Sequence, residues 1–460
     1  MKRERMVLVT GYVEGETYGL LGPQLAASII QEHTLYDCIV VTVTRVDDKN
    51  LLNIALQDYF GNRRPIVGFS YLGGRTDLFS LARELKQQGS FTILAGPQAD
   101  VDFLGEKGRH DHPHYFQGLS DCFSMAVHGP AEGILPFLKH PMHQNALSDP
   151  GLVNASSPWN EQFLTKVHWD NLYRPDSGTL APLRVTSAQV LHQIGCPHAS
   201  QSKFMEIDYP VALKRKEEDK VKLSVKGCSF CDVAVDKGFH GLLGLDAVLE
   251  QIQRLPEQED GRKIPFELIH ENAIPALPAL LARVRANGIR LSQINLTLRA
   301  DWFVSARKIL REALALAGAL EVRILLGSVG FESFDDRILA NLHKGLDAET
   351  NLRAVALMRE IKNEFPRQWA YARQEGAIHG FIHPTPWDTV ETESNNKRTI
   401  SLYGLLDDIL PERSIPLIIH HASALGDWIR EIENREGIRF KREGTTIGWW
   451  QVGDSFILYP

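Results

Sequence analysis

Short apolar, β-branched segments alternate with helical patterns along most of the chain, and this alternation restricts the fold to the α/β class. Within the first 140 residues the expected strands are MVLVTG, DCIVVTVT, PIVGFSYL, FTILAG and MAVHG. Between them, the segment DLFSLARELKQQG carries apolar residues at a spacing that buries one face of a helix. We therefore expect a Rossmann-like, doubly wound parallel sheet over residues 1–140, with ligands beyond the carboxyl ends of its strands.

A second α/β unit is predicted farther along the chain. Residues 141–185 are rich in proline, asparagine, serine and glycine and are interpreted as a linker, although four aromatic residues predict that it packs. From 186 to 395, strands alternate with the helical stretches DAVLEQIQRL, LPALLARVRAN and VSARKILREALALAG, a pattern typical of a partial (β/α)6 TIM-type barrel. Residues 396–460 are expected to form a small carboxyl-terminal cap.

Three of the five cysteines indicate a metal centre. Cys228 and Cys231 lie in KGCSFCDVA, and Cys196 ends the apolar run VTSAQVLHQIGC. Thiolates grouped in this way favour a metal or iron–sulfur site over a disulfide. The 31 residues between Cys196 and Cys228 are unusual, yet removing residues 199–225 would leave the compact loop GCPH-KGCSFC. A structural zinc site that adds His198 to the three thiolates is the alternative.

The cysteine string resembles the CxxxCxxC signature of the radical S-adenosylmethionine (SAM) superfamily, with Phe230 as the aromatic residue before the last cysteine. Downstream strings that match the family in order are FELIHENAIP, INLTLRADWFV, VRILLGSVGFESFDDRILANLHKG and AIHGFIHPTPWDT, and a new helix is expected near Asp347. The resemblance implies a [4Fe–4S] cluster held by Cys196, Cys228 and Cys231. It also implies a set of SAM contacts, namely Glu271, Arg299, Gly327, Gly330, Glu332 and Ser333.

The first unit resembles the cobalamin-binding domain of one radical SAM subgroup. No GxGxxG fingerprint follows its first strand, so a nicotinamide or flavin site is unsupported there. The resemblance implies that Ser70, Leu72, Gly96 and Gly129 border the corrin, where small residues leave room for a bulky macrocycle. The familiar DxHxxG loop has no counterpart in TGYVEGETYGLLG. A sheet that keeps the fold without the cofactor is the alternative.

The function implied by the resemblance is that of a cobalamin-dependent radical SAM enzyme. Such an enzyme would methylate an unactivated carbon by way of a 5′-deoxyadenosyl radical, on a small-molecule or peptide substrate, with an electron donor such as flavodoxin or ferredoxin. A cobalamin-type radical SAM cyclase or rearrangement enzyme would share every motif. A nonenzymatic cobalamin- or zinc-binding protein is a further alternative.

Composition limits the partners and the compartment. The net charge of −7 argues against a broad surface for nucleic acids, which basic patches usually bind. No apolar run reaches the roughly 18 residues that a membrane span requires. The start MKRERMVLVTG lacks the features of a secretory signal, and a cysteine set of metal-binding type suits a reducing compartment. We therefore expect a cytoplasmic protein.

Overall fold

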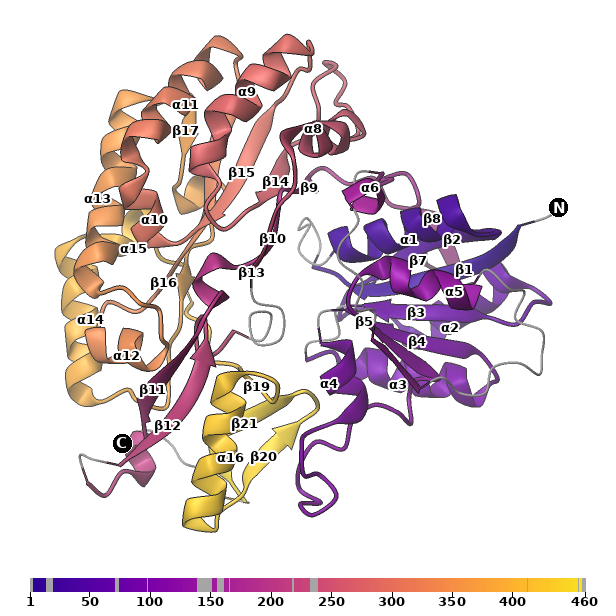
Figure 1. Cartoon of the computed structure of the whole chain (residues 1–460), viewed down its shortest axis with the longest axis horizontal. Helices are drawn as coiled ribbons and strands as arrows, with labels where there is room; N and C mark the ends of the chain where they lie inside the picture. Colours follow the sequence, from indigo (N-terminus) through magenta and orange to yellow (C-terminus); the bar gives the residue numbers. More distant parts are fainter. Residues whose placement is uncertain are drawn as a thin grey trace. The chain divides into compact units, whose positions relative to one another are not determined.

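The computed structural model describes most of the chain. The described residues are 3–13, 20–70, 74–96, 98–138, 151–154, 161–164, 166–216, 219–231, 239–411, 413–453 and 455–456. The chain forms two compact units, one made of Met1–Gln189 with Glu250–Pro256 and the other of Val190–Leu249 with Glu257–Pro460. Both combine a largely parallel sheet with helices (Figure 1), which confirms the α/β class.

The first unit contains an eight-stranded sheet of order β6-β5-β4-β3-β1-β2-β7-β8. Its strands are β1 (Glu4–Gly11), β2 (Tyr36–Val43), β3 (Ile66–Ser70), β4 (Phe91–Ala95), β5 (Met125–His128), β6 (Gly151–Asn154), β7 (Leu172–Asp176) and β8 (Thr179–Pro182). All neighbours are parallel except β7 and β8. Three of the described strands lie within the predicted linker: β6 pairs with β5, and β7 and β8 extend the sheet beyond β2.

The helices of the first unit follow its strands. They are α1 (Leu21–His33), α2 (Lys49–Phe60), α3 (Thr76–Gln87), α4 (Ala99–Leu104), the short α5 (Leu135–Leu138) and α6 (Glu161–Leu164). In α3, Leu78, Leu81, Ala82 and Leu85 are buried, as the helical spacing predicts. These residues join valines and other apolar side chains of the strands in one apolar core.

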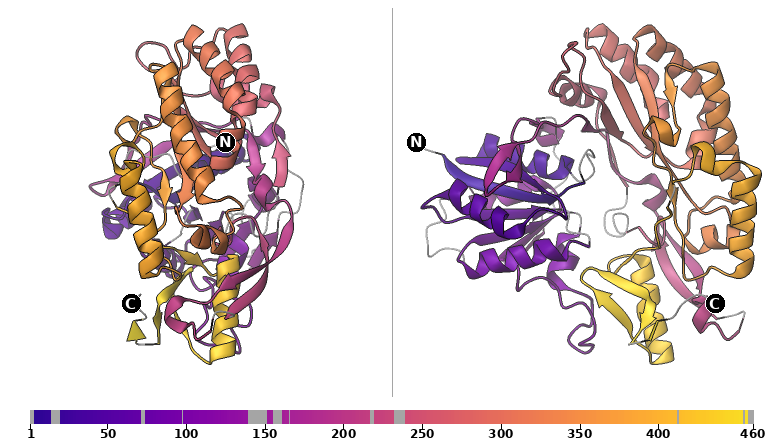
Figure 2. Two further views of the ribbon diagram at one scale, coloured as in Figure 1. Left: turned by 90° about the vertical axis from the view of Figure 1, so that its left-hand side faces the viewer. Right: turned by 180° about the vertical axis from the view of Figure 1, so that it is seen from behind.

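The second unit has a sheet of order β17-β16-β15-β14-β9, with β18 paired to β16. Its strands are β9 (Ala188–Leu191), β14 (Phe266–Ile269), β15 (Gln293–Leu298), β16 (Arg323–Glu332), β17 (Trp369–Ala370) and β18 (Gly380–Phe381). The main helices are α8 (Leu245–Gln253), α9 (Leu277–Ala286), α10 (Ala300–Ser305), α11 (Arg307–Ala319), α12 (Asp336–Asn341), α13 (Ala348–Glu364), α14 (Val390–Leu402) and α15 (Leu405–Asp408). Figure 2 shows this sheet and its helices from two further sides. The described strands do not close into a barrel.

The insertion between Cys196 and Cys228 is an antiparallel hairpin. Its strands are β11 (Ser202–Asp208) and β12 (Lys220–Lys226), and the ladder runs from the Ser202–Lys226 pair to the Asp208–Lys220 pair. Paired strands lie about 4.8 Å apart. The chain therefore leaves and re-enters the second unit at nearly the same place, and the long excursion adds little spatial separation between the two cysteine segments.

A small cap follows α15 in the chain. It consists of β19 (Ile419–His420), α16 (Ala424–Glu436), β20 (Phe440–Glu443), β21 (Thr446–Val452) and β22 (Ser455–Phe456). Buried side chains of the cap share one apolar cluster with Ile207, Tyr209 and Val221 of the hairpin region and with Trp387. The minor strands β10 (Gln193–Gly195) and β13 (Phe239–Leu242) pair with each other in a separate antiparallel two-stranded sheet. No helix in the described part of the chain has both the length and the apolar content needed to cross a membrane.

The indole of Trp387 is expected to anchor the hairpin. It is fully buried, and its Nε1 donates to the carbonyl oxygen of Asp208 at 2.9 Å. Trp387→Phe keeps most of the apolar surface but leaves that carbonyl without its donor, a loss worth about 1–3 kcal/mol. Urea denaturation should show this decrease in the free energy of unfolding, and Trp450→Phe, at a half-buried indole, should change it much less. Equal effects of the two substitutions would contradict the anchoring role.

Candidate active site

Three of the predicted SAM contacts come from neighbouring parallel strands of the second unit. Glu271 follows β14, Arg299 directly follows β15, and Glu332 is the last residue of β16. Because these strands run in parallel, their carboxyl ends meet at one edge of the sheet. The structure therefore brings together charged residues that lie up to 61 positions apart in sequence (332 − 271).

A buried ion pair is at the centre of this group. Lys344 Nζ donates to Glu332 Oε1 at 2.9 Å, and the two residues are only 4% and 7% exposed. Burial opposes the charge on the lysine, but the negative charges of Glu332 and of Cys228 in its thiolate form outweigh burial and raise the pKa of Lys344. The second oxygen of Glu332, Oε2, is buried and has no hydrogen-bond partner among the described residues. A donor from a ligand would satisfy it.

The backbone at Glu332 is strained in a way that places its carboxylate. Its φ is +57°, in the left-handed region that non-glycine residues rarely adopt. The carboxylate lies over Gly330, where an added Cβ would stand 2.6 Å from Oε1 and 2.9 Å from Oε2. Only glycine at position 330 therefore permits this placement. Such outliers are common where a structure holds a side chain for function.

Glu271 and Arg299 lie near the same ion pair. Burial raises the pKa of Glu271, while the positive charges of Lys344 and Arg299 partly offset that rise. Gln193 Oε1 accepts a hydrogen bond from the backbone N–H of Glu271 at 2.9 Å. Arg299 is 6% exposed, and its guanidinium bonds to Asp301 at 3.1 Å and to the carbonyl of Lys344.

The predicted cluster ligands border this charged group. None of the five cysteines, all of which lie in described ranges, forms a disulfide. Arg299 Nη1 stands 3.9 Å from Cys228 Sγ, and the backbone N–H of Cys231 donates to the carbonyl of Cys228 at 3.1 Å. Burial raises the pKa of the Cys228 thiol, against the opposing effect of Lys344 and Arg299.

Cys196 interacts electrostatically with Glu271 and Cys228. Burial, the carboxyl of Glu271 and the thiol of Cys228 raise its pKa to about 11, so it is a thiol at neutral pH. Among the described residues, no group of three or more His, Cys, Asp or Glu side chains is arranged to hold a metal ion. A centre bound by Cys196, Cys228 and Cys231 would therefore have to remove protons from its ligands and draw them together on binding.

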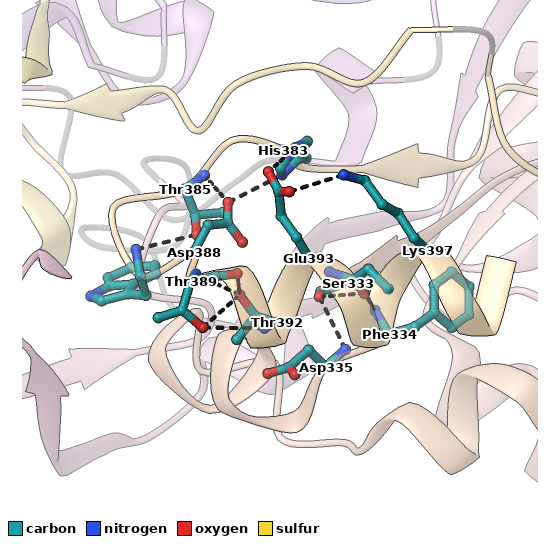
Figure 3. A network of polar contacts seen from close by, with 12 residues as sticks. Ser333, Phe334, Asp335, His383, Thr385, Asp388, Thr389, Thr392, Glu393 and Lys397 are labelled. Carbon is teal, nitrogen blue, oxygen red and sulfur yellow. Dashed lines mark hydrogen bonds and ion pairs between the residues drawn. The ribbon is translucent and has the colours of Figure 1, made fainter. Parts of the chain in front are cut away.

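The other predicted SAM contacts lie along β16 and the turn after it. Gly327 and Gly330 are within the strand, and Ser333 follows Glu332. Figure 3 shows the surroundings of Ser333: its hydroxyl accepts from the backbone N–H of Asp335 at 3.1 Å and donates to Asn396 Oδ1 at 3.4 Å. Ser333 is 1% exposed. In this structure its side chain thus braces the turn against α14.

Two histidines at the same strand ends escaped the sequence reasoning. His192 and His270 are buried, and their Nδ1 atoms are 3.0 Å apart, so one of them must donate to the other. Burial and the neighbouring His192 lower the pKa of His270 to about 4. The sequence feature that could have indicated His270 is its position between an apolar strand and Glu271. Lys344 is also not predicted as a site residue, although it lies in LHKG, at the end of a string that resembles the family.

In the first unit, the predicted corrin contacts gather at one sheet edge. Ser70 ends β3, Gly96 follows β4, and Gly129 follows β5, and these three strands are adjacent and parallel. A Cβ added to Gly96 would stand 3.9 Å from Ser70 Oγ, so the two residues are close neighbours. Leu72 lies outside the described residues. The structure therefore places the three described positions as the parallel topology predicts.

A cavity of about 640 Å³ lies at the opposite edge of the same sheet. Its lining combines acidic, basic and amide side chains from the end of α1 and the start of β2 and β7, among them Glu32, Asp37, Lys166 and Asn171. It lies at the amino ends of the strands, whereas the predicted corrin contacts lie at the carboxyl ends. The two regions are thus distinct.

No protein-family profile matches this chain, and no similar sequence was found among curated proteins.

The Lys344–Glu332 pair provides a test of the charge balance in the site. Lys344→Met leaves the Glu332 carboxylate buried without its cation, and breaking a buried pair in this way costs about 3–5 kcal/mol. The double variant Lys344→Met/Glu332→Gln removes both charges and should recover most of that stability. Chemical denaturation of the wild type, the single variants Lys344→Met and Glu332→Gln, and the double variant measures the coupling free energy between the two side chains. Additive losses in the double variant would show that the two side chains do not depend on each other.

A second test concerns His383 in the network of Figure 3. Its Nδ1 donates to Asp388 Oδ2 at 3.1 Å, and this hydrogen bond, against the effect of burial, raises the pKa of His383. The protonated pair therefore adds stability below the unfolded-state pKa of about 6.5, and that gain is lost as pH rises through the folded-state pKa. His383→Gln should cost about 1 kcal/mol near pH 5.5 and much less near pH 8.5. The exposed residue His110, changed to glutamine, is the control; a pH-independent loss at His383 would contradict the assignment.

Proposed function

We propose that this chain is a cobalamin-dependent radical SAM enzyme that methylates an unactivated carbon. In this proposal, the first unit is a Rossmann-like cobalamin-binding domain, and the second is a partial (β/α)6 TIM-type barrel with a carboxyl-terminal cap. The observation that carries the proposal is the group of Glu271, Arg299, Glu332 and Lys344 around Cys228, at the carboxyl ends of parallel strands. Sites in α/β folds occupy this edge.

The residues present suit an iron–sulfur centre bound by three cysteines. Such a cluster and its thiolates carry negative charge, and Arg299 and Lys344 place positive charge next to Cys228. His198, the fourth zinc ligand in the alternative, already bonds through Nε2 to the carbonyl of His343 at 3.0 Å. Because zinc-bound histidines commonly donate one ring N–H to a carbonyl and bind the metal through the other nitrogen, this contact is compatible with both ligand sets, and metal analysis distinguishes them.

When bound, the reduced cluster would supply the electron that cleaves SAM to a 5′-deoxyadenosyl radical, and cobalamin would supply the methyl group. The role of the protein is to bind and orient. Glu271 and the free oxygen of Glu332 would accept hydrogen bonds from SAM, and Arg299 and Lys344 would hold the local charge in balance. Gly327, Gly330 and Ser333 would shape the turn that SAM approaches. Arg299, Glu332, Ser333 and Lys344 are buried, which would limit the access of water to the site.

In the first unit, Ser70, Gly96, Gly129 and the undescribed Leu72 would border the corrin. Small residues at adjacent strand ends leave space for a flat macrocycle, as the neighbouring positions of Ser70 and Gly96 illustrate. The substrate would be a small molecule or a peptide. An electron donor such as flavodoxin or ferredoxin would reduce the cluster. A cyclase or rearrangement enzyme of the same type would use the same residues and differ only in its product.

Anaerobic reconstitution with iron and sulfide, followed by metal analysis and mass spectrometry for 5′-deoxyadenosine, tests the proposal. We expect about four irons per chain, SAM cleavage after reduction, and bound cobalt when cobalamin is supplied. Cys228→Ala should abolish cleavage and lower the iron content, because it removes one of three ligands. Cys38→Ala, at a buried cysteine of β2 in the first unit, is the matched control and should retain both.

The possible results separate the parts of the proposal. If metal analysis finds zinc and no iron, the site is a structural zinc site and the radical SAM proposal is wrong. Iron and cleavage without cobalt would keep the SAM assignment and remove methyl transfer through cobalamin. Cleavage retained in Cys228→Ala would overturn the ligand assignment.

A further inference from the structure

The carboxyl-terminal end of α12 holds the two cysteine segments. We call residues 341–344 the docking turn. Its four consecutive carbonyls each accept a hydrogen bond from outside the helix: Asn341 O from Ser229 Oγ at 2.8 Å, Leu342 O from Ser229 N at 3.0 Å, His343 O from His198 Nε2 at 3.0 Å, and Lys344 O from Arg299. Asn341 is the last residue of α12 and Leu342 is its C-cap, so the two donors of Ser229 complete the helix end, and His198 and Arg299 bond to the turn that follows it.

The donors come from both sides of the insertion. His198 lies two residues after Cys196, and Ser229 directly follows Cys228. His343 links the two segments by itself: its carbonyl accepts from His198, and its ring Nδ1 donates to the carbonyl of Gly227 at 2.6 Å. Because carbonyls only accept, these bonds require a proton on Nδ1 of His343 and on Nε2 of His198.

The backbone of the turn is shaped for these contacts. His343 has a φ of +51°, and Gly345 has a φ of +68°. A Cβ on Gly345 would stand 3.0 Å from His198 Cε1, so glycine allows the histidine to approach. The side chain of Asn341 also accepts from the backbone N–H of Asp208 at 3.0 Å, which ties the far end of β11 to the same turn.

We propose that the docking turn is a positioning device for the metal-binding cysteines. It aligns the Cys196 segment with the Cys228–Cys231 segment and thereby makes one ligand set from two segments that 31 residues separate. His198, Ser229 and His343 are its positioning residues. The inference rests on the proposed function, because it takes the three cysteines as ligands of one centre.

Cobalt(II) titration of the anaerobic, metal-free full-length chain tests this inference without enzyme activity. Thiolate-to-cobalt charge-transfer absorption reports both the affinity and the number of thiolates bound. The double variant Ser229→Ala/His343→Gly removes two donors, and glycine accommodates the positive φ at position 343. We expect cobalt binding to weaken about fivefold for each hydrogen bond lost, with lower charge-transfer intensity per cobalt. Ser224→Ala, on the exposed side of β12, is the matched control and should bind like wild type.

A rescue variant separates positioning from general destabilisation. His343→Asn tolerates positive φ and restores an N–H donor, so it should recover part of the affinity and intensity relative to His343→Gly. Wild-type affinity and intensity in the double variant would overturn the inference. If the double variant does not fold, Ser229→Ala and His198→Gln are compared instead, and the glutamine, which keeps an N–H donor, should bind more tightly than His198→Ala.

The outcomes of the two proposals are distinguishable. Weakened cobalt binding in the variants, together with a wild-type protein that never cleaves SAM, would support the positioning role of the docking turn and contradict the radical SAM function. SAM cleavage by the wild type, with unchanged cobalt binding in every variant, would support the radical SAM function and contradict the positioning role.

Discussion

The buried Lys344–Glu332 pair is the constraint on which the candidate site depends. Two charges taken out of water cost several kcal/mol each, and only close contact and further hydrogen bonds offset that cost. Glycine at 330 makes room for the carboxylate, and the strained backbone at 332 directs it. The pair thus fixes the end of β16 relative to the loop after α12. The last residue of α12 and this loop carry the carbonyls that accept hydrogen bonds from the cysteine segments.

The positive charges of Arg299 and Lys344 act on the thiol of Cys228. Arg299 contacts Cys228 Sγ and also bonds to the carbonyl of Lys344, so one guanidinium joins the strand end, the docking turn and the thiol. Arginine suits this position because its planar fork donates in several directions at once. Burial alone would keep the thiols protonated, and the nearby cations oppose that tendency at Cys228. Burial prevails at both Cys228 and Cys196, whose pKa values are raised, so a metal that binds these sulfurs would have to displace their protons.

Local sequence patterns predicted the features that depend on local physics. The alternation of strands and helices, the buried face of α3, and the start of α13 after the capping residue Asp347 all follow from periodicity and side-chain capping. The pairing of Glu332 with Lys344 and the register of the insertion hairpin depend on contacts between distant residues, which no local pattern specifies. The strands β7 and β8 were hidden for a similar reason: their polar, proline-rich sequence indicates a linker, yet the open edge of β2 accepts a further strand.

The hairpin shows why a long insertion need not disrupt a compact ligand set. An antiparallel ladder returns the chain to its starting point, and the entropy of closing the loop rises only slowly with its length. The ladder does not, however, fix the orientation of the two segments that carry Cys196 and Cys228 relative to each other. Ser229 and His198 donate hydrogen bonds to consecutive carbonyls of one turn, and these bonds supply that missing restraint. A helix end with unsatisfied carbonyls is well suited to this purpose, because its acceptors are rigid, closely spaced and otherwise in need of donors.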